Sequence, residues 1–148
     1  MHIYFSTNAI PAENWERIHE YLDEFEGEIG LEIFPEYHKP CFEGALRKEL
    51  AYLEQMPCSL HGPYYESEYA VAGDSEEFRH SVELLRKTLE EVAPLHVSYM
   101  VYHHSNMVIR EEEKAQRLAY ARENYETVRK ICEEYGVPPV VENVTLGT

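Results

Sequence analysis

Histidine and glutamate side chains recur in this sequence where short apolar runs end. His61 closes one such run, His103 and His104 follow a second, and Glu142 and Asn143 follow a third. Imidazole nitrogens and carboxylate oxygens are common ligands of zinc, manganese and related divalent ions. A carboxylate such as that of Glu142 can also act as a general base. The pattern therefore indicates metal or acid–base chemistry, provided that the fold brings these groups together.

Each of these groups also has a structural interpretation when it is taken alone. A histidine at the end of a strand is more often a hydrogen-bonded structural group than a ligand, and Glu32 can equally be an ordinary salt-bridge partner. Four aromatic rings can stack on a sugar, those of Tyr4, Phe34, Tyr64 and Tyr65, but a chain with 12 tyrosines places several near any cleft. The agreement of His61, His103 and Glu142 at three successive strand ends is the stronger observation.

The elements that must position these groups alternate along the chain. Strand-like runs occupy residues 2–10, 30–36, 58–62, 96–105 and 139–145. Apolar residues between them recur at spacings of three and four, which predicts helices over Trp15–Phe25, Phe42–Leu53, Phe78–Val92 and Leu118–Tyr135. Asp74 and Glu77 resemble a capping box before the third helix.

Alternation of strands and helices predicts a parallel sheet with helices outside it. Right-handed crossovers leave two architectures: an open doubly wound sheet or part of a (β/α)8 barrel. No glycine-rich phosphate loop follows the first strand, which disfavours dinucleotide binding. In a barrel, the carboxyl ends of the strands form the rim of the active site, which is where the histidines and Glu142 are expected.

The adjacent histidines of the fourth strand cannot serve the same site. Successive side chains on a strand point to opposite faces. Strict alternation groups Val97, Tyr99, Val101 and His103 on one face, and Ser98, Met100, Tyr102 and His104 on the other. One imidazole is therefore expected in the interior and the other against a helix or a loop, and the sequence leaves open which.

Length, charge and cysteine content restrict the classes of protein to which the chain can belong. The chain has 148 residues, 44% of them apolar, which predicts one globular domain over residues 1–148. A formal charge of -15 disfavours nucleic acid as a partner. No apolar run has the ~20 residues of a membrane span, and the N-terminus does not resemble a signal peptide. Three widely spaced cysteines indicate reduced thiols and a cytoplasmic protein.

The segments GLEIFPE, SLHGPYY, VYHHSN and VVENV resemble the strand ends of the xylose isomerase-like barrel superfamily. This group includes sugar phosphate isomerases and epimerases and the endonuclease IV type of abasic-site nuclease. The resemblance covers essentially the whole chain. It implies an α/β fold, a partial (β/α)8 TIM-type barrel of about five parallel strands alternating with four helices.

The resemblance also implies a metal site. Glu142 is similar to the fifth-strand glutamate that binds the divalent metal in both branches of the superfamily. His61 and His103 are similar to third- and fourth-strand histidines, which bind zinc in the nuclease branch and more often contact substrate in the isomerase and epimerase branch. The superfamily usually has His-Pro-Gly after its fourth strand. Here His103 is followed by His104 and Ser105, so the choice between the two histidines stays open.

The function implied by the resemblance is that of a metal-dependent sugar or sugar phosphate isomerase or epimerase, with zinc, manganese or magnesium as cofactor. Glu142 is the expected catalytic residue, and Glu32, His61, Tyr64 and Asn143 are the expected substrate-binding residues. An endonuclease IV-like phosphoesterase is the alternative, which the histidines favour and the charge disfavours. A non-catalytic binding module is the third interpretation.

Length is the main departure from the superfamily. A whole barrel has eight strands and about 250 residues, whereas this sequence has five predicted strands. The chain is either the N-terminal portion of a longer barrel, which we favour, or a short natural relative. We expect weak metal binding and little or no turnover by the chain itself. Its first and last strands are expected to be open edges, which invite pairing with another chain. A homodimer formed through these edges is therefore the expected assembly.

Overall fold

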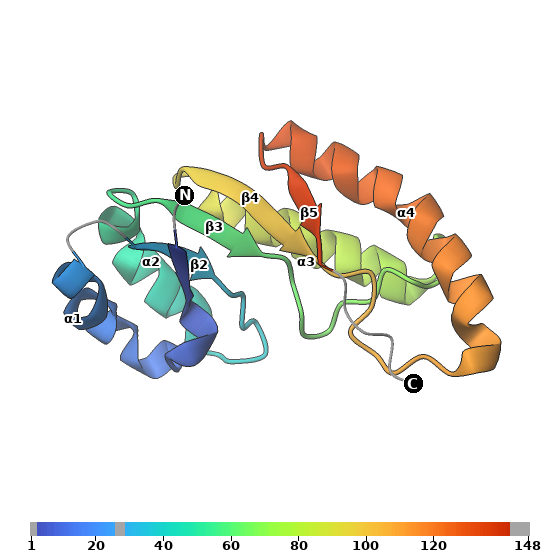
Figure 1. Cartoon of the computed structure of the whole chain (residues 1–148), viewed down its shortest axis with the longest axis horizontal. Helices are drawn as coiled ribbons and strands as arrows, with labels where there is room; N and C mark the ends of the chain where they lie inside the picture. The colour runs from blue at the N-terminus through green and yellow to red at the C-terminus, as the bar shows by residue number, and fades with distance from the viewer. Residues whose placement is uncertain (1–2, 26–28, 143–148) are drawn as a thin grey trace.

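A computed structural model of the chain describes residues 3–25 and 29–142 (Figure 1). Within these residues, five strands form one sheet: β1 (Ile3–Ser6), β2 (Ile29–Ile33), β3 (Cys58–His61), β4 (Val97–Tyr102) and β5 (Pro139–Val141). Their order in space is their order in the sequence, and every neighbouring pair is parallel. In a doubly wound sheet the order of the strands in space reverses at a switch point, whereas in a barrel each strand lies beside the one before it in the sequence. The topology is therefore that of a partial barrel.

Helices follow the strands, as the alternation predicted. The longer ones are α2 (Phe42–Leu53), α3 (Glu76–Val92) and α4 (Lys114–Glu134), the last preceded by the short turn η4 (Glu111–Glu113). Figure 1 shows α2 and α3 behind the strands and α4 beside β5. Ser75, rather than the predicted Asp74, is the N-cap of α3, because its hydroxyl accepts a hydrogen bond from the Phe78 amide at 3.1 Å. No helix of the described residues has the length and apolar character needed to cross a membrane.

The first predicted helix is broken into short pieces. After the turn η1 (Thr7–Ala9), the chain forms η2 (Ala12–Arg17), α1 (Ile18–Leu22) and η3 (Asp23–Phe25). Asn14, with φ of -116° and ψ of 19°, interrupts the helical geometry inside η2. Trp15, Ile18 and Leu22 are nevertheless buried together. The apolar spacing thus predicted three residues of the buried face, whereas Phe25 is 46% exposed. The prediction of one continuous helix was wrong.

The hydrophobic core lies between the sheet and the helices. Alternate strand residues point into it and are at most 1% exposed: Leu31, Ile33, Cys58, Leu60, Met100 and Tyr102. The strand residues between them point to the opposite face of the sheet. That face is where Glu32, His61 and Val101 project, so the carboxyl ends of the strands carry polar groups away from the core.

Strand β4 contains one irregularity that strict alternation did not predict. Val97 pairs with Cys58 and Met100 pairs with Leu60, so two residues of β4 lie opposite the single residue Ser59. This is the arrangement of a β-bulge. Val97 therefore shares the helix-facing side with Met100, and its predicted place beside Tyr99 and His103 was wrong. Beyond Met100 the pairing with β3 and β5 is regular.

The sheet is curved, and its helix-free face is concave. Tyr4 of β1 and Tyr99 of β4 belong to strands that are not neighbours, yet their rings meet edge to face with centroids 5.7 Å apart. The Tyr4 hydroxyl also donates to the Ser98 hydroxyl at 3.4 Å. Contacts across two intervening strands require the sheet to bend around this face. A curved parallel sheet with a concave side-chain layer is the geometry of a barrel wall.

Candidate metal centre

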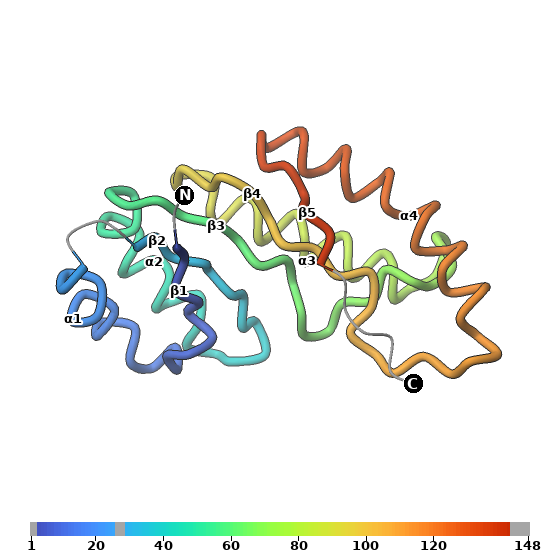
Figure 2. Tube along the Cα trace, in the orientation of Figure 1, coloured from blue at the N-terminus to red at the C-terminus, as the bar shows by residue number. Residues whose placement is uncertain are grey.

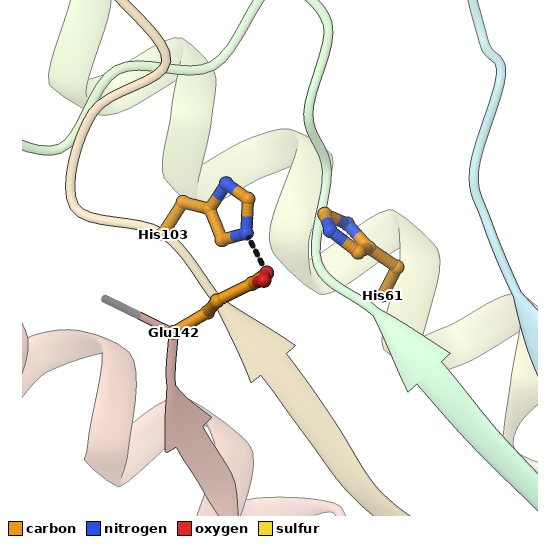
Figure 3. A group of neighbouring side chains, drawn as sticks. All are labelled: His61, His103 and Glu142. Carbon is orange, nitrogen blue, oxygen red and sulfur yellow. Dashed lines mark hydrogen bonds and ion pairs between the residues drawn. The ribbon is translucent and has the colours of Figure 1, made fainter. Parts of the chain in front are cut away.

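Three side chains converge at the carboxyl ends of adjacent strands (Figure 3). His61 is the last residue of β3, His103 follows β4, and Glu142 follows β5. His61 pairs with Val101, and Val101 pairs with Val140, so these residues lie level on the concave face. His103 and Glu142 are each two residues further along and point to that same face. Backbone register therefore explains why the three groups share one hollow.

The distances within this group are short. His103 Nε2 and Glu142 Oε2 are 2.6 Å apart and hydrogen-bonded (Figure 3). The imidazole rings of His61 and His103 lie 4.8 Å apart between centroids. One nitrogen or oxygen from each of the three residues lies within 4.8 Å of the other two. The expected proximity is present, and the role of these residues as ligands stays a prediction.

His61 is prepared to offer one nitrogen to the hollow. Its Nδ1 lies 2.7 Å from the carbonyl oxygen of Gly62, which can only accept, so Nδ1 carries the proton. Nε2 then keeps its lone pair. Burial, reinforced by the charge of His103, lowers the pKa of His61 and favours the neutral ring. The Phe34 ring packs on this imidazole with centroids 4.4 Å apart.

His103 and His104 separate as strand alternation requires. His103 faces the hollow, whereas His104 packs edge-on against Tyr102 and Tyr125, with centroids 5.1 and 6.2 Å away. Nδ1 of His104 is buried without a hydrogen-bond partner among the described residues. Burial lowers the pKa of His104, and the neighbouring His103 adds to the effect. The structure therefore presents His103, and not His104, to the site.

The remaining predicted residues lie around the three central ones or outside the described chain. Glu32 lines the same hollow, together with Tyr99, Val101, Val140 and Val141. The Tyr64 ring stands beside both histidines, with centroids 6.0 Å from His61 and 5.7 Å from His103. Asn143 lies outside the described residues. Substrate contact by Glu32 and Tyr64 stays a prediction.

The donors present fit a divalent metal. Two imidazoles and one carboxylate form a ligand set of catalytic zinc sites, which keep a further position open. Ligands bound at about 2.0–2.2 Å to one tetrahedral ion lie roughly 3.4 Å apart. His103 Nε2 and Glu142 Oε2, which are 2.6 Å apart, must therefore separate slightly, and ligand atoms that lie up to 4.8 Å apart must approach one another. The proton shared by His103 and Glu142 must leave when a metal takes its place. Metal binding and proton release are therefore coupled here.

Phe34 was predicted as a ring that can stack on a sugar, whereas Asn106 was not among the predicted residues. Phe34 covers one side of His61 and is 7% exposed. Asn106 accepts from His103, its Oδ1 lying 2.9 Å from Nδ1. An asparagine three residues after a strand-end histidine is a weak sequence signal, because its contact depends on the path of the loop.

Comparison with known proteins gives the fold. No family model matches the chain, and no curated protein matches it. Among solved structures, a D-tagatose 3-epimerase-like protein aligns with a TM-score of 0.71 and 17% identity over 97% of this chain and 53% of its own. The TTHB071 protein of Thermus thermophilus, soaked with ZnCl2, aligns at 0.64 and 20% over 96% and 55%. Endonuclease IV of the same organism aligns at 0.51 and 22% over 99% and 52%.

These neighbours define a class. The chain has the fold of a partial TIM barrel and shares it with these solved structures, which confirms the predicted fold. It spans about half the length of the solved chains that it matches. Identities of 17–22% show the fold alone, so its chemistry must be argued from the site.

Proposed function

We propose that the chain carries three ligands of a divalent metal centre in a sugar or sugar phosphate isomerase or epimerase. The convergence of His61, His103 and Glu142 on one hollow supports this proposal most directly. The solved structure of a D-tagatose 3-epimerase-like protein, which shares the fold, supports the sugar class of substrate. Zinc is the first metal to test, because imidazole and carboxylate ligands suit it and a structural neighbour was soaked with ZnCl2.

Each residue of the site would have a separate role toward the metal or the substrate. When bound, the metal would polarise adjacent oxygens of the substrate. His61 and His103 hold imidazole nitrogens toward the hollow, and Glu142 offers a carboxylate that is 57% exposed. Glu32 lines the same hollow and would contact substrate hydroxyls. Phe34 and Tyr64 exclude water from one side of His61 and offer apolar ring surface to a sugar.

An endonuclease IV-like phosphoesterase is the second candidate. The shared fold and the pair of histidines favour it. The net charge of -15 disfavours it, because a duplex backbone repels an acidic surface. We also infer a reducing compartment such as the cytoplasm, because Cys41, Cys58 and Cys132 are all free.

Metal titration of the purified chain tests the proposal. Zinc should bind with one-to-one stoichiometry in calorimetry, weakly if the metal needs further ligands from later strands of a whole barrel, and ketose turnover should be little or none. His61→Ala, His103→Ala and Glu142→Gln should each weaken binding at least tenfold. His80→Ala, which removes an exposed histidine of α3, is the matched control and should bind as the unchanged chain does. Equal zinc affinity in all five proteins would overturn the proposal.

The two enzyme classes differ in what the zinc-loaded chain should bind. A ketose or its phosphate should give saturation-transfer NMR signals that disappear in Glu142→Gln. A DNA duplex with an abasic site, followed by fluorescence anisotropy, should show no saturable binding at physiological salt. Saturable binding of that duplex, with no ketose signal, would favour the nuclease class instead. Absence of both, with zinc binding intact, would favour a non-catalytic metal-binding module.

A further inference from the structure

We propose that Asn106 is a positioning residue that keeps the proton of His103 on Nδ1, so that Nε2 presents its lone pair to the hollow. The inference rests on the proposed function for its purpose, although the hydrogen bonds that carry it are independent of any metal. Asn106 lies in the loop after β4 and is partly buried. Its side-chain amide bridges two elements of the site, His103 on one side and the Tyr64 carbonyl on the other.

The direction of these hydrogen bonds follows from one group that cannot change its role. The backbone carbonyl of Tyr64 can only accept, so the Asn106 atom 2.8 Å away must be the Nδ2 donor. That assignment turns Oδ1 toward His103. Because Oδ1 can only accept, Nδ1 of His103, 2.9 Å away, must donate. The lone pair available for a metal is then on Nε2, the nitrogen that faces Glu142.

His61 reaches the same state by a different route. Its Nδ1 donates to the Gly62 carbonyl, which leaves Nε2 for the hollow. Both histidines therefore use a fixed acceptor behind the ring to present the same nitrogen in front of it. Histidines that bind metals commonly donate their other ring N–H to a carbonyl or carboxylate in this manner. For His103 that acceptor is a side chain, so it can be replaced.

The loops that hold Asn106 are fixed to each other. Figure 2 shows the segments after β3 and β4 leaving the same end of the sheet. The amide of Tyr69 donates to the carbonyl of His104 at 3.1 Å. The buried carboxylate of Glu68 accepts from the Ser105 hydroxyl at 2.7 Å. These bonds hold the chain just before Asn106 against the loop that carries Tyr64, which keeps the Asn106 side chain within reach of both His103 and the Tyr64 carbonyl.

A purely structural role for Asn106, as a tie between two loops, makes a different prediction. Such a role depends on the donor to Tyr64 and is indifferent to the state of His103. A positioning role depends on the acceptor toward His103. Asn106→Asp separates the two, because it keeps an acceptor for Nδ1 and removes the donor to the carbonyl. Asn106→Ala removes both, and Asn14→Ala is the control at an exposed asparagine of η2.

Nitrogen NMR of the metal-free chain gives the first test. The Glu142→Ala background is used because the carboxylate otherwise competes for the proton at Nε2. Long-range proton–nitrogen spectra at mildly alkaline pH should show neutral His103 with its proton on Nδ1. Asn106→Ala should shift His103 to a mixture with the other tautomer, whereas Asn106→Asp and Asn14→Ala should retain the Nδ1 proton. An unchanged tautomer in Asn106→Ala would overturn the inference, whether or not zinc binds.

Zinc affinity in the otherwise unchanged chain gives the second test. Loss of an outer hydrogen bond to a metal-binding histidine costs about 10–100-fold in affinity. Asn106→Ala should show a loss in that range, and Asn106→Asp a smaller one. If the unchanged chain does not bind zinc, the proposed function fails while the NMR result still decides the role of Asn106. If zinc binds and Asn106→Ala binds it equally well, the positioning role is rejected and the metal site stands.

Discussion

The choice between two adjacent histidines is the central fact at the scale of the residue. His103 lies over the hollow with Glu142, while His104 lies in the helix-facing layer beside Tyr102 and Tyr125. The amino-acid types are identical, and only the direction of the side chain separates a candidate ligand from a packing group. The sequence predicted that one of them would face the interior, but the choice required knowledge of strand pairing.

Replacement of each histidine by phenylalanine should separate these roles. His104→Phe conserves ring volume among aromatic neighbours and removes a buried nitrogen without a partner among the described residues. It should change the free energy of unfolding by less than about 1.5 kcal/mol and leave zinc affinity unchanged. His103→Phe should abolish measurable zinc binding. Chemical denaturation and calorimetry measure both quantities, and loss of zinc binding in His104→Phe alone would reverse the assignment.

The residues of the site were predictable to different degrees for a physical reason. His61, Glu142 and one of the two adjacent histidines sit at strand ends, and parallel strands place their carboxyl ends on one edge, so period and topology suffice to group them. Asn106 acts through a loop, where no periodicity relates sequence spacing to position. Glu32 and Tyr64 could be placed near the hollow, and their contacts with substrate remain predictions.

At the scale of the element, Gly30 marks a closely packed point on the concave face of the sheet. Gly30 of β2 pairs with Tyr4, whose ring lies across it. A Cβ at Gly30 would stand 2.6 Å from the Pro57 carbonyl oxygen and 2.7 Å from the Tyr4 ring. The glycine therefore permits Tyr4 to cross the concave face and reach Tyr99.

A pair of alanine substitutions tests this packing. Gly30→Ala should lower the free energy of unfolding by about 1–3 kcal/mol, because it overpacks a site bounded by backbone. Gly44→Ala is the matched control, since Gly44 is exposed in α2 and a Cβ there meets nothing within 4 Å. It should raise the free energy of unfolding by up to about 1 kcal/mol. Equal effects of the two changes in urea denaturation would contradict the account.

Element order was more predictable than element geometry. The alternation of apolar runs with helical spacings predicted five strands and the parallel sheet, because short apolar runs bounded by turn residues leave a strong pattern. The broken first helix was not predicted, since Trp15, Ile18 and Leu22 keep a helical spacing even where Asn14 departs from helical angles. The irregular pairing of β4 was also missed, because a single extra residue changes no composition and only offsets the alternation.

At the scale of the whole molecule, the described sheet is a wall with two edges. β1 and β5 each pair on one side only within the described residues. Ile3 on the first edge is 64% exposed, and Val140 on the last is 50% exposed. Exposed apolar residues on unpaired strands favour association with another chain. The expected homodimer through these edges therefore stays a prediction with a structural basis.

Light scattering coupled to size-exclusion chromatography tests the predicted homodimer. The 148-residue chain should elute with a mass above that of the monomer at micromolar concentration and dissociate on dilution. Val140→Lys places a charge on the edge strand and should shift the equilibrium to monomer. Val108→Lys is the control, because Val108 is 85% exposed in the loop after β4 and belongs to neither edge strand. A monomer at all concentrations, with a single cooperative unfolding transition, would rule out the dimer.

Two residues of β4, Ser98 and Tyr99, lie opposite the single residue Ser59 of β3. This irregularity has a consequence for the far end of β4. In a strictly regular strand, a one-residue slip exchanges inward and outward side chains along its whole length. Here the surplus residue is absorbed between Val97 and Met100, before the regular stretch that leads to His103. The irregularity in the early part of β4 therefore leaves His103 and His104 on the faces that the regular pairing beyond Met100 gives them. The candidate ligand is selected by that regular stretch and not by the start of the strand.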